Sequence, residues 1–175
     1  MHRSVSALAG VALSLGLLAA LPSAAEAAAA DTPCTDVEVV YARGAGQGLS
    51  AAESDRFRLQ LMDRIQEPLT MQFYEVGTEA IGGYQYPAVA VGDPRTLVGA
   101  FTTAGEANEY GASVDAGAAE MLMYLMQRRD ACPESRFVLG GYSQGAQVVG
   151  EILGGAQYFM AGNIDFVALF GDPKL

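Results

Sequence analysis

The sequence predicts an α/β fold in which helices cover both faces of a central parallel sheet. Four short apolar segments alternate along the chain with segments of helical periodicity. The third apolar segment runs directly into a glycine-flanked serine and then into a helix. Parallel strands joined in this way need right-handed helical crossovers. We therefore expect a three-layer sandwich.

The first 27 residues have the layout of a secretory signal peptide. Arg3 precedes an apolar run over residues 5–21, and Ala27, Ala29 and Ala30 offer small residues at which cleavage can occur. The alternative is a membrane anchor, but the run is short for a membrane span and nothing basic follows it to stop transfer. We expect residues 28–175 to form one secreted, extracellular domain without stable membrane insertion.

The charge of the chain restricts its partners. A net charge of −10 disfavours nucleic acid and anionic membranes, because an acidic surface repels both. A neutral or apolar small molecule or polymer fits better. No cluster of residues has the spacing of metal ligands. We expect a monomer that uses neither a metal nor another cofactor.

The first half of the domain predicts two strands and a helix. β-Branched and apolar residues at 37–42 predict a buried strand that enters a glycine-rich turn at 43–48. Ser50 and Glu53 have capping-box spacing, which predicts a helix that continues towards Pro68. Residues 71–76 predict the second strand. The glycines and prolines of residues 77–105 predict a long surface loop.

The second half predicts two helices and two further strands. The longest helix is expected at residues 106–129, and its apolar face is expected to carry Ala118, Leu122, Leu125 and Met126. Residues 137–141 predict the third strand, residues 144–153 a helix and residues 164–170 the fourth strand.

The candidate chemistry centres on the G-x-S-x-G sequence at residues 141–145. In a nucleophile elbow the serine has a strained backbone at a sharp turn, so the residues two before and two after it must be small. Gly141 and Gly145 meet this requirement, which predicts Ser143 as a nucleophile. The N–H of Gln144, at a helix N-terminus, is expected to be one oxyanion donor, and the N–H of Ala45 the second. The alternative for the turn around Ala45 is a glycine turn with no catalytic role.

The chain resembles the cutinase family in three motifs that occur in the family's order: YARG at residues 41–44, GYSQGA at 141–146 and FGDP at 170–173. The resemblance implies a cutinase-like α/β-hydrolase fold without a large lid. Its last strand and helix would be missing from this chain. It also implies a serine esterase that hydrolyses cutin-like polyesters, short acyl esters or acetylated polysaccharide.

The chain has two cysteines, Cys34 and Cys132, which are similar to a disulfide of that family. An oxidising compartment also favours joining them. A disulfide that closes so long a loop stabilises the fold by on the order of 4 kcal/mol. The alternative is two free thiols.

Two departures from the family pattern bear on activity. Many members carry Ser or Thr where this chain has Ala45, and the missing hydroxyl donor can cost about 10²-fold in rate. The single histidine, His2, lies in the predicted signal peptide. Neither Asp165 nor Asp172 stands where the family has its catalytic acid, and Asp172 is expected to form a turn before Pro173. We therefore expect a truncated, nearly inactive chain.

Two other functions remain as alternatives. The first is a secreted, non-catalytic binding protein that kept the fold but lost its acid and histidine. The coding sequence beyond Leu175 distinguishes it from an incomplete esterase. The second is a flavodoxin-like binder of phosphate or nucleotide, which is disfavoured because the glycine-rich turn at 43–48 lacks the G-x-x-x-x-G-K pattern.

Overall fold

The computed structural model describes residues 32–65, 67–90, 109–160 and 162–174, with side chains placed for all of these except residues 156–160. The predicted signal peptide and residues 91–108 of the predicted loop and helix lie outside the described residues. No helix in the described ranges is long and apolar enough to cross a membrane.

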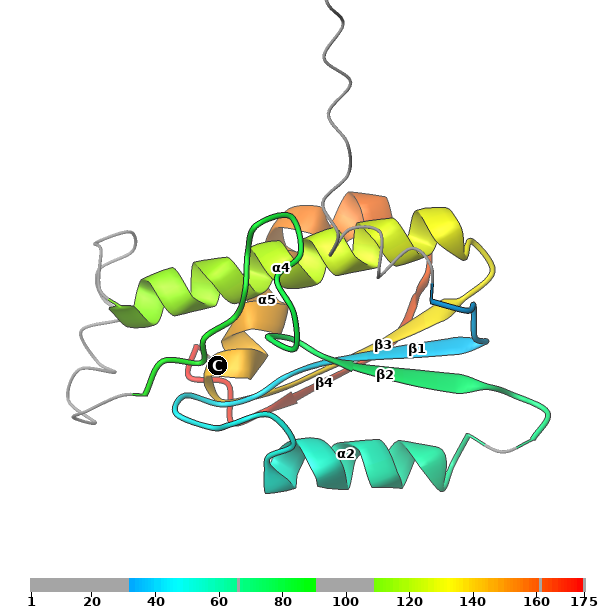
Figure 1. Ribbon diagram of the computed structural model, residues 1–175, viewed down its shortest axis with the longest axis horizontal. Helices are drawn as coiled ribbons and strands as arrows, with labels where there is room; N and C mark the ends of the chain where they lie inside the picture. The colour runs from blue at the N-terminus through cyan, green and yellow to red at the C-terminus, as the bar shows by residue number, and fades with distance from the viewer. Residues whose placement is uncertain (1–31, 66, 91–108, 161, 175) are drawn as a thin grey trace, which may run out of the picture.

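The described chain forms a four-stranded parallel sheet with the strand order β2-β1-β3-β4. Helix α2 lies on one face of this sheet, and α4 and α5 lie on the other (Figure 1). The elements are β1 (Val37–Ala42), α2 (Ala52–Met62), β2 (Met71–Glu75), α4 (Glu109–Ala131), β3 (Arg136–Tyr142), α5 (Gln144–Met160) and β4 (Ile164–Phe170). The predicted α/β class with its central parallel sheet is confirmed. Because all strands are parallel, their carboxyl ends meet at one edge of the sheet.

Strand β1 lies inside the sheet and is buried on both faces. Val40 and Ala42 belong to the core beneath α4 and α5, whereas Val39 and Tyr41 pack towards α2 with Phe57. Alternate residues of a strand point to opposite faces, so such a central strand needs a mainly apolar run, and the one charged residue of β1, Glu38, pairs with Arg128. This is why the sequence of β1 was recognisable.

The predicted start of α2 is wrong. Ser50 lies outside the helix with a φ of 57°, and the N-cap is Ala51, which makes no side-chain capping bond. The backbone N–H of Ser50 donates instead to Glu75 Oε2 at 2.8 Å, so a carboxylate from β2 fixes the turn before the helix. The helix also ends at Met62 rather than continuing towards Pro68.

The predicted apolar face of α4 is right for Leu125, which is buried, and for Ala118 and Leu122, which pack against the core, but wrong for Met126. Its buried side includes Glu120 and Arg128, whereas Met126 is exposed and Ala118 and Leu122 are only partly buried. The full extent of the buried side was not predictable from periodicity, because charged residues are counted as exposed. The following helix, α5, continues beyond the predicted end at residue 153 to Met160.

The part of the predicted surface loop that the structure describes, residues 77–90, is mostly exposed but places a few side chains in the core. It contains one isolated bridge, between Ile81 and Tyr84. Ile81, Tyr86 and Ala88 are buried. The buried backbone N–H and C=O groups of such a segment need hydrogen-bond partners. Side chains of the core supply them here, as described below. The prediction of a surface loop with little regular structure therefore holds for most of this part, but not for these three buried side chains.

Cys34 and Cys132 form a disulfide with an S–S distance of 2.02 Å. It ties the residues before β1 to the end of α4, at the amino end of the sheet. The described residues hold no group of three or more histidine, cysteine or carboxylate side chains that could bind a metal ion.

Candidate active site

Ser143 lies between β3 and α5, at the carboxyl edge of the sheet. Its φ of 52° is in the left-handed region that non-glycine residues rarely adopt. The backbone around it holds this conformation: its N–H donates to Phe170 O at 2.8 Å, and its carbonyl accepts from Ala146 N at 2.9 Å and Gln147 N at 3.2 Å. The strained turn is therefore built from β4 on one side and the first turn of α5 on the other.

The two glycines of the motif make this turn sterically possible. A Cβ on Gly141 would lie 2.3 Å from Gly145 O, and a Cβ on Gly145 would lie 2.0 Å from Ala42 O. Both contacts are with backbone atoms, which cannot move aside as a side chain can. The requirement for small residues on either side of Ser143, predicted from the sequence, is met in the structure.

Two backbone N–H groups beside the turn are free to bind a ligand. Gln144 is the first residue of α5, so its N–H has no acceptor within the helix. In the described part of the chain, neither this N–H nor that of Ala45 has a hydrogen-bond acceptor. Ala45 follows β1 and is half-buried against the core. The carboxyl ends of β1 and β3 are neighbours, in register from Val37 with Arg136 to Ala42 with Gly141.

The turn that carries Ala45 is held by the side chain of Arg43. The buried guanidinium donates to Gln47 O at 2.8 Å, Val76 O at 2.6 Å and Tyr86 O at 3.0 Å. The next two turn residues are also bonded: Gly44 N donates to Gln47 Oε1 at 2.7 Å, and Gly46 N to Ala88 O at 2.6 Å. Every other backbone N–H from Gly44 to Gln47 is satisfied, and that of Ala45 is left available.

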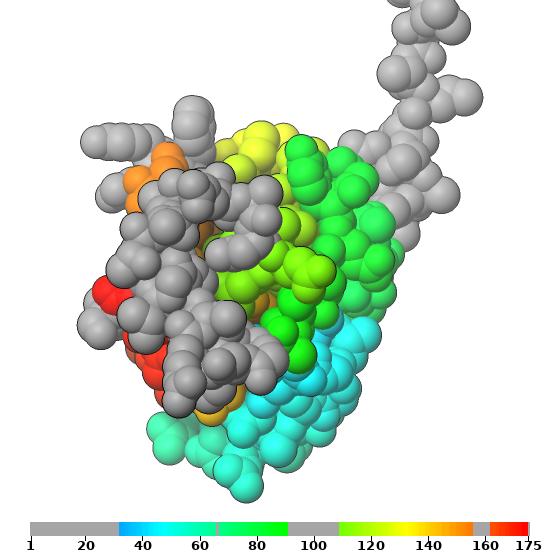
Figure 2. Space-filling model, turned by 90° about the vertical axis from the view of Figure 1, so that its left-hand side faces the viewer, coloured from blue at the N-terminus to red at the C-terminus, as the bar shows by residue number. Residues whose placement is uncertain are grey.

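The segment after β2 supports this turn from the side. Figure 2 looks onto the carboxyl ends of the strands, where the turn after β1 (cyan) lies next to the segment that ends near residue 90 (bright green). Glu120 of α4 anchors this segment, because its carboxylate accepts from Gly77 N, Tyr86 N and Tyr74 Oη. Burial raises the pKa of the Glu120 carboxyl, and these three hydrogen bonds oppose the rise.

The two carboxylates in and just after β4 have other partners. Asp165, on β4, pairs with Arg136 at the amino end of β3, far along the strand from Ser143. A side-chain hydrogen bond from Arg136 lowers the pKa of Asp165. Asp172 accepts from the N–H of Lys174 at 2.9 Å, as in the turn predicted for it. His2 lies outside the described residues.

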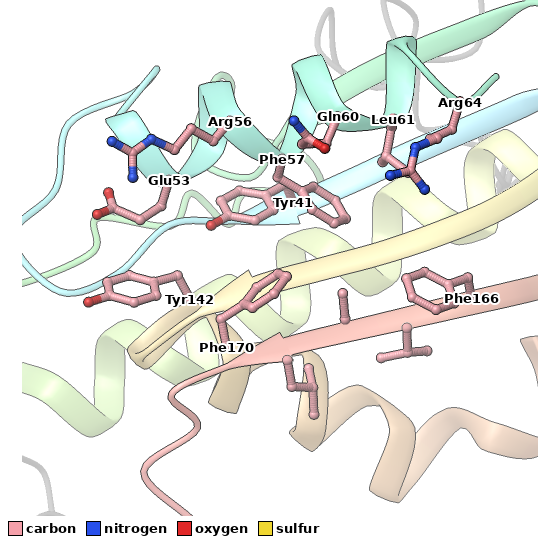
Figure 3. Close-up of a pocket in the computed structure, with 13 residues that line it drawn as sticks. Tyr41, Glu53, Arg56, Phe57, Gln60, Leu61, Arg64, Tyr142, Phe166 and Phe170 are labelled. Atoms are coloured by element: carbon pink, nitrogen blue, oxygen red, sulfur yellow. The ribbon is translucent and has the colours of Figure 1, made fainter. Parts of the chain in front are cut away.

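A groove of about 830 Å³ opens on the α2 face of the sheet (Figure 3). Aromatic side chains dominate its lining, and two of them, Phe166 and Phe170 of β4, are 54% and 47% exposed. Tyr142 points into the groove between α2 and β4, but Ser143 is not among the lining residues. The groove is thus an uncovered apolar face of the sheet rather than the space in front of the serine.

The family model named Cutinase matches residues 33–175. The chain belongs to the cutinase family. It is 32% identical over 166 residues to the carboxylesterase Culp1 of Mycobacterium tuberculosis, a match that covers 94% of this chain and 63% of the relative. It is also 32% identical over 157 residues to a cutinase of Kineococcus radiotolerans, covering 80% of this chain and 42% of the relative. The chain therefore spans less than two thirds of the length of these relatives.

Solved structures show the same fold. The catalytic core of acetyl xylan esterase from Trichoderma reesei matches with a TM-score of 0.58 at 21% identity, covering 81% of this chain and 65% of that one. The Trichoderma reesei cutinase in complex with a phosphonate inhibitor matches with a TM-score of 0.51 at 26% identity, covering 81% and 53%. The predicted cutinase-like α/β-hydrolase fold is confirmed by these likenesses.

Sequence analysis missed the residues that support the site. Arg43 is part of the YARG motif, but nothing in the motif alone assigns it a role. An arginine directly after a buried strand was the one available signal, because a buried guanidinium must find several acceptors. Tyr86 and Glu120 gave none, since the first lies in a segment predicted to be exposed and the second on a helix face predicted to be polar.

Proposed function

We propose that the protein is a secreted serine esterase with Ser143 as its nucleophile. The observation that supports this best is the left-handed backbone of Ser143 between two glycines that admit no Cβ, in a chain of the cutinase family. A non-glycine residue is held in such a conformation only where the surrounding structure enforces it. This conformation exposes the hydroxyl at the edge of the sheet, as a nucleophile elbow requires.

The free N–H groups fit the charge that develops during ester hydrolysis. Attack of Ser143 Oγ on the ester carbonyl carbon moves an electron pair onto the carbonyl oxygen. The N–H groups of Gln144 and Ala45 stabilise that oxyanion, and the N-terminus of α5 adds a favourable dipole. Collapse of the tetrahedral intermediate expels the alcohol and leaves an acyl-serine, which water then hydrolyses.

A base must accept the proton of Ser143, and the described residues include no histidine. We propose that the complete natural gene product supplies the histidine and its acid from sequence outside residues 1–175. Residues 1–175 alone then have only the residual rate that binding and the oxyanion donors provide, roughly 10³-fold over water. Reading the coding sequence beyond Leu175 tests this, because an immediate stop codon would favour the non-catalytic binding protein.

The proposed substrates are neutral carboxylic esters. The net charge of −10 disfavours anionic ones. The relatives and neighbours are named carboxylesterase, cutinase and acetyl xylan esterase, which supports short acyl esters, cutin-like polyesters or acetylated polysaccharide as candidates. The disulfide and the N-terminal sequence support export from the cell. Sequencing of the secreted protein's N-terminus tests export, and retention of residues 8–21 would contradict it.

The test of the function uses the complete natural gene product and a short p-nitrophenyl ester. Ser143→Ala is expected to lower kcat by on the order of 10⁶, because the nucleophile is lost. Ser50→Ala is a matched control, since Ser50 is the other serine of the described chain with a positive φ, and its hydrogen bond to Glu75 is made by its backbone N–H, which alanine keeps. Its activity should be unchanged. An active enzyme whose rate survives Ser143→Ala would overturn the proposal.

A further inference from the structure

Tyr86 joins the two backbone segments that carry the proposed oxyanion donors. Its hydroxyl lies 2.8 Å from Arg43 O and 3.0 Å from Gln144 Oε1. Arg43 opens the turn that carries Ala45, and Gln144 is the residue that follows the serine. The ring is 1% exposed, so these bonds form away from water. One buried hydroxyl therefore connects the turn after β1 to the first residue of α5.

The proton of the Tyr86 hydroxyl lies between two acceptors. A phenol has a single proton, so it donates to one oxygen only and can accept from a second group. The Tyr86 hydroxyl therefore donates to Arg43 O or to Gln144 Oε1, both of which lie within hydrogen-bond distance of it. Gln144 Oε1 also accepts from Ser113 Oγ of α4 at 3.2 Å, so a second element holds the same amide. Burial raises the pKa of the phenol, so it keeps its proton at neutral pH.

The rest of Tyr86 is fixed as firmly as its hydroxyl. Its N–H donates to Glu120 Oε2, and its carbonyl accepts from Arg43 Nη2 at 3.0 Å. Its ring lies over Gly117 of α4, where an added Cβ would come within 2.6 Å of the ring carbon Cδ2. A side chain held at both ends and along its ring can set the distance between the parts that it joins.

We propose that Tyr86 is a positioning residue that sets the separation of the Ala45 and Gln144 N–H groups. The inference rests on the proposed function, because it concerns the stabilisation of an oxyanion at Ser143. The donors act only when they lie about 2.7–3.1 Å from the developing charge. A shift of the turn relative to α5 therefore weakens transition-state stabilisation without changing how the ground-state ester binds.

A purely structural role is separated from positioning by a matched tyrosine at the other end of the sheet. Tyr124 is 2% exposed and donates to Glu38 Oε2 at 3.2 Å, near the amino end of β1. Tyr86→Phe and Tyr124→Phe each remove one buried hydroxyl and the hydrogen bond that it donates to an oxygen. Both are expected to lower Tm by similar amounts, about 5 °C.

The experiment compares kcat and KM of the two variants in the complete natural gene product with a p-nitrophenyl ester. Tyr86→Phe is expected to lower kcat by about tenfold or more with KM within about twofold, and Tyr124→Phe to change neither. Arg43→Lys, which keeps the charge but loses the three-way hydrogen bonding, supplies a second variant and should also lower kcat at constant KM. An active wild-type enzyme in which Tyr86→Phe and Arg43→Lys both behave like Tyr124→Phe would overturn this inference alone. An inactive wild type would overturn the proposed function and this inference with it.

Discussion

The two ends of the sheet each bury an arginine, but they use it differently. At the amino end, Arg128 Nε lies 2.9 Å from both oxygens of Glu38, and its Nη atoms donate to the carbonyls of Thr32 and Pro33. At the carboxyl end, Arg43 donates to three carbonyls and makes no ion pair within the described residues. The first arginine neutralises a buried charge, and the second shapes a turn.

The backbone groups at the two ends differ in the same way. At the amino end, Val37 N donates to Thr70 O, Arg136 N to Asp36 O and Phe137 N to Asn163 O, and the disulfide closes the end. At the carboxyl end, the N–H groups of Ala45 and Gln144 have no acceptor in the described chain, and Ser143 is strained. These backbone N–H groups at the amino end have hydrogen-bond acceptors, whereas two at the carboxyl end remain available to bind a ligand. We expect substitutions at the amino end to change stability and those at the carboxyl end to change rate.

The largest effect on stability is expected from Arg128→Met. The substitution leaves the carboxylate of Glu38 buried without its cation, which lowers the free energy of unfolding by about 4 kcal/mol. Urea denaturation measures this loss. The double variant Glu38→Leu/Arg128→Met is the control and should recover much of it, because no charge is then buried alone. If either variant lowered kcat of the folded enzyme beyond about twofold, the separation between the two ends would be wrong.

A smaller loss is expected when the disulfide is removed. Cys34→Ala/Cys132→Ala should lower the free energy of unfolding by about 3 kcal/mol, since the unfolded chain is no longer cross-linked over 98 residues. The kcat of the folded enzyme should not change, because the bond lies at the end away from Ser143. Unreduced wild-type protein should show no alkylatable thiol after denaturation. Two reactive thiols there would contradict the bond itself.

The smallest expected effect is a pH dependence at the amino end. The carboxylate of Asp36 accepts from Thr70 Oγ1 at 2.6 Å and from Thr70 N at 2.7 Å, and these hydrogen bonds lower its pKa. Because the folded pKa lies below the unfolded value, this stabilisation is present above the unfolded pKa and is lost as pH falls through the folded one. Asp36→Asn should therefore have a lower Tm than wild type at pH 7, and the difference should shrink in acid. A difference that stays constant with pH would contradict this assignment.

Local steric and periodic rules accounted for the parts of the molecule that the sequence could predict. β1 and β4 have the predicted bounds, because β-branched and aromatic residues favour strands both in the buried β1 and in the partly exposed β4. The turn at Ser143 was predictable because its clashes involve only residues 141–145 and the adjoining strand.

Features fixed by partners far along the chain were not predictable. Ser50 failed as a cap because Glu75, on the next strand, takes its N–H. The charged part of the buried face of α4 was missed because Glu120 and Arg128 are buried through partners on other elements. The support of the oxyanion turn by Tyr86 depends on contacts with Arg43 and Gln144, 43 and 58 positions away. Such contacts leave no periodic trace in the sequence.

The central claim is that the carboxyl end of the sheet carries an activated serine, and covalent labelling tests it most directly. A fluorophosphonate reacts with a serine only where a base and oxyanion donors activate it. In the complete natural gene product, peptide mapping by mass spectrometry should find one phosphonyl group, on the peptide that contains Ser143, and none in Ser143→Ala. A label on another residue, or equal labelling of Ser143→Ala, would contradict the account.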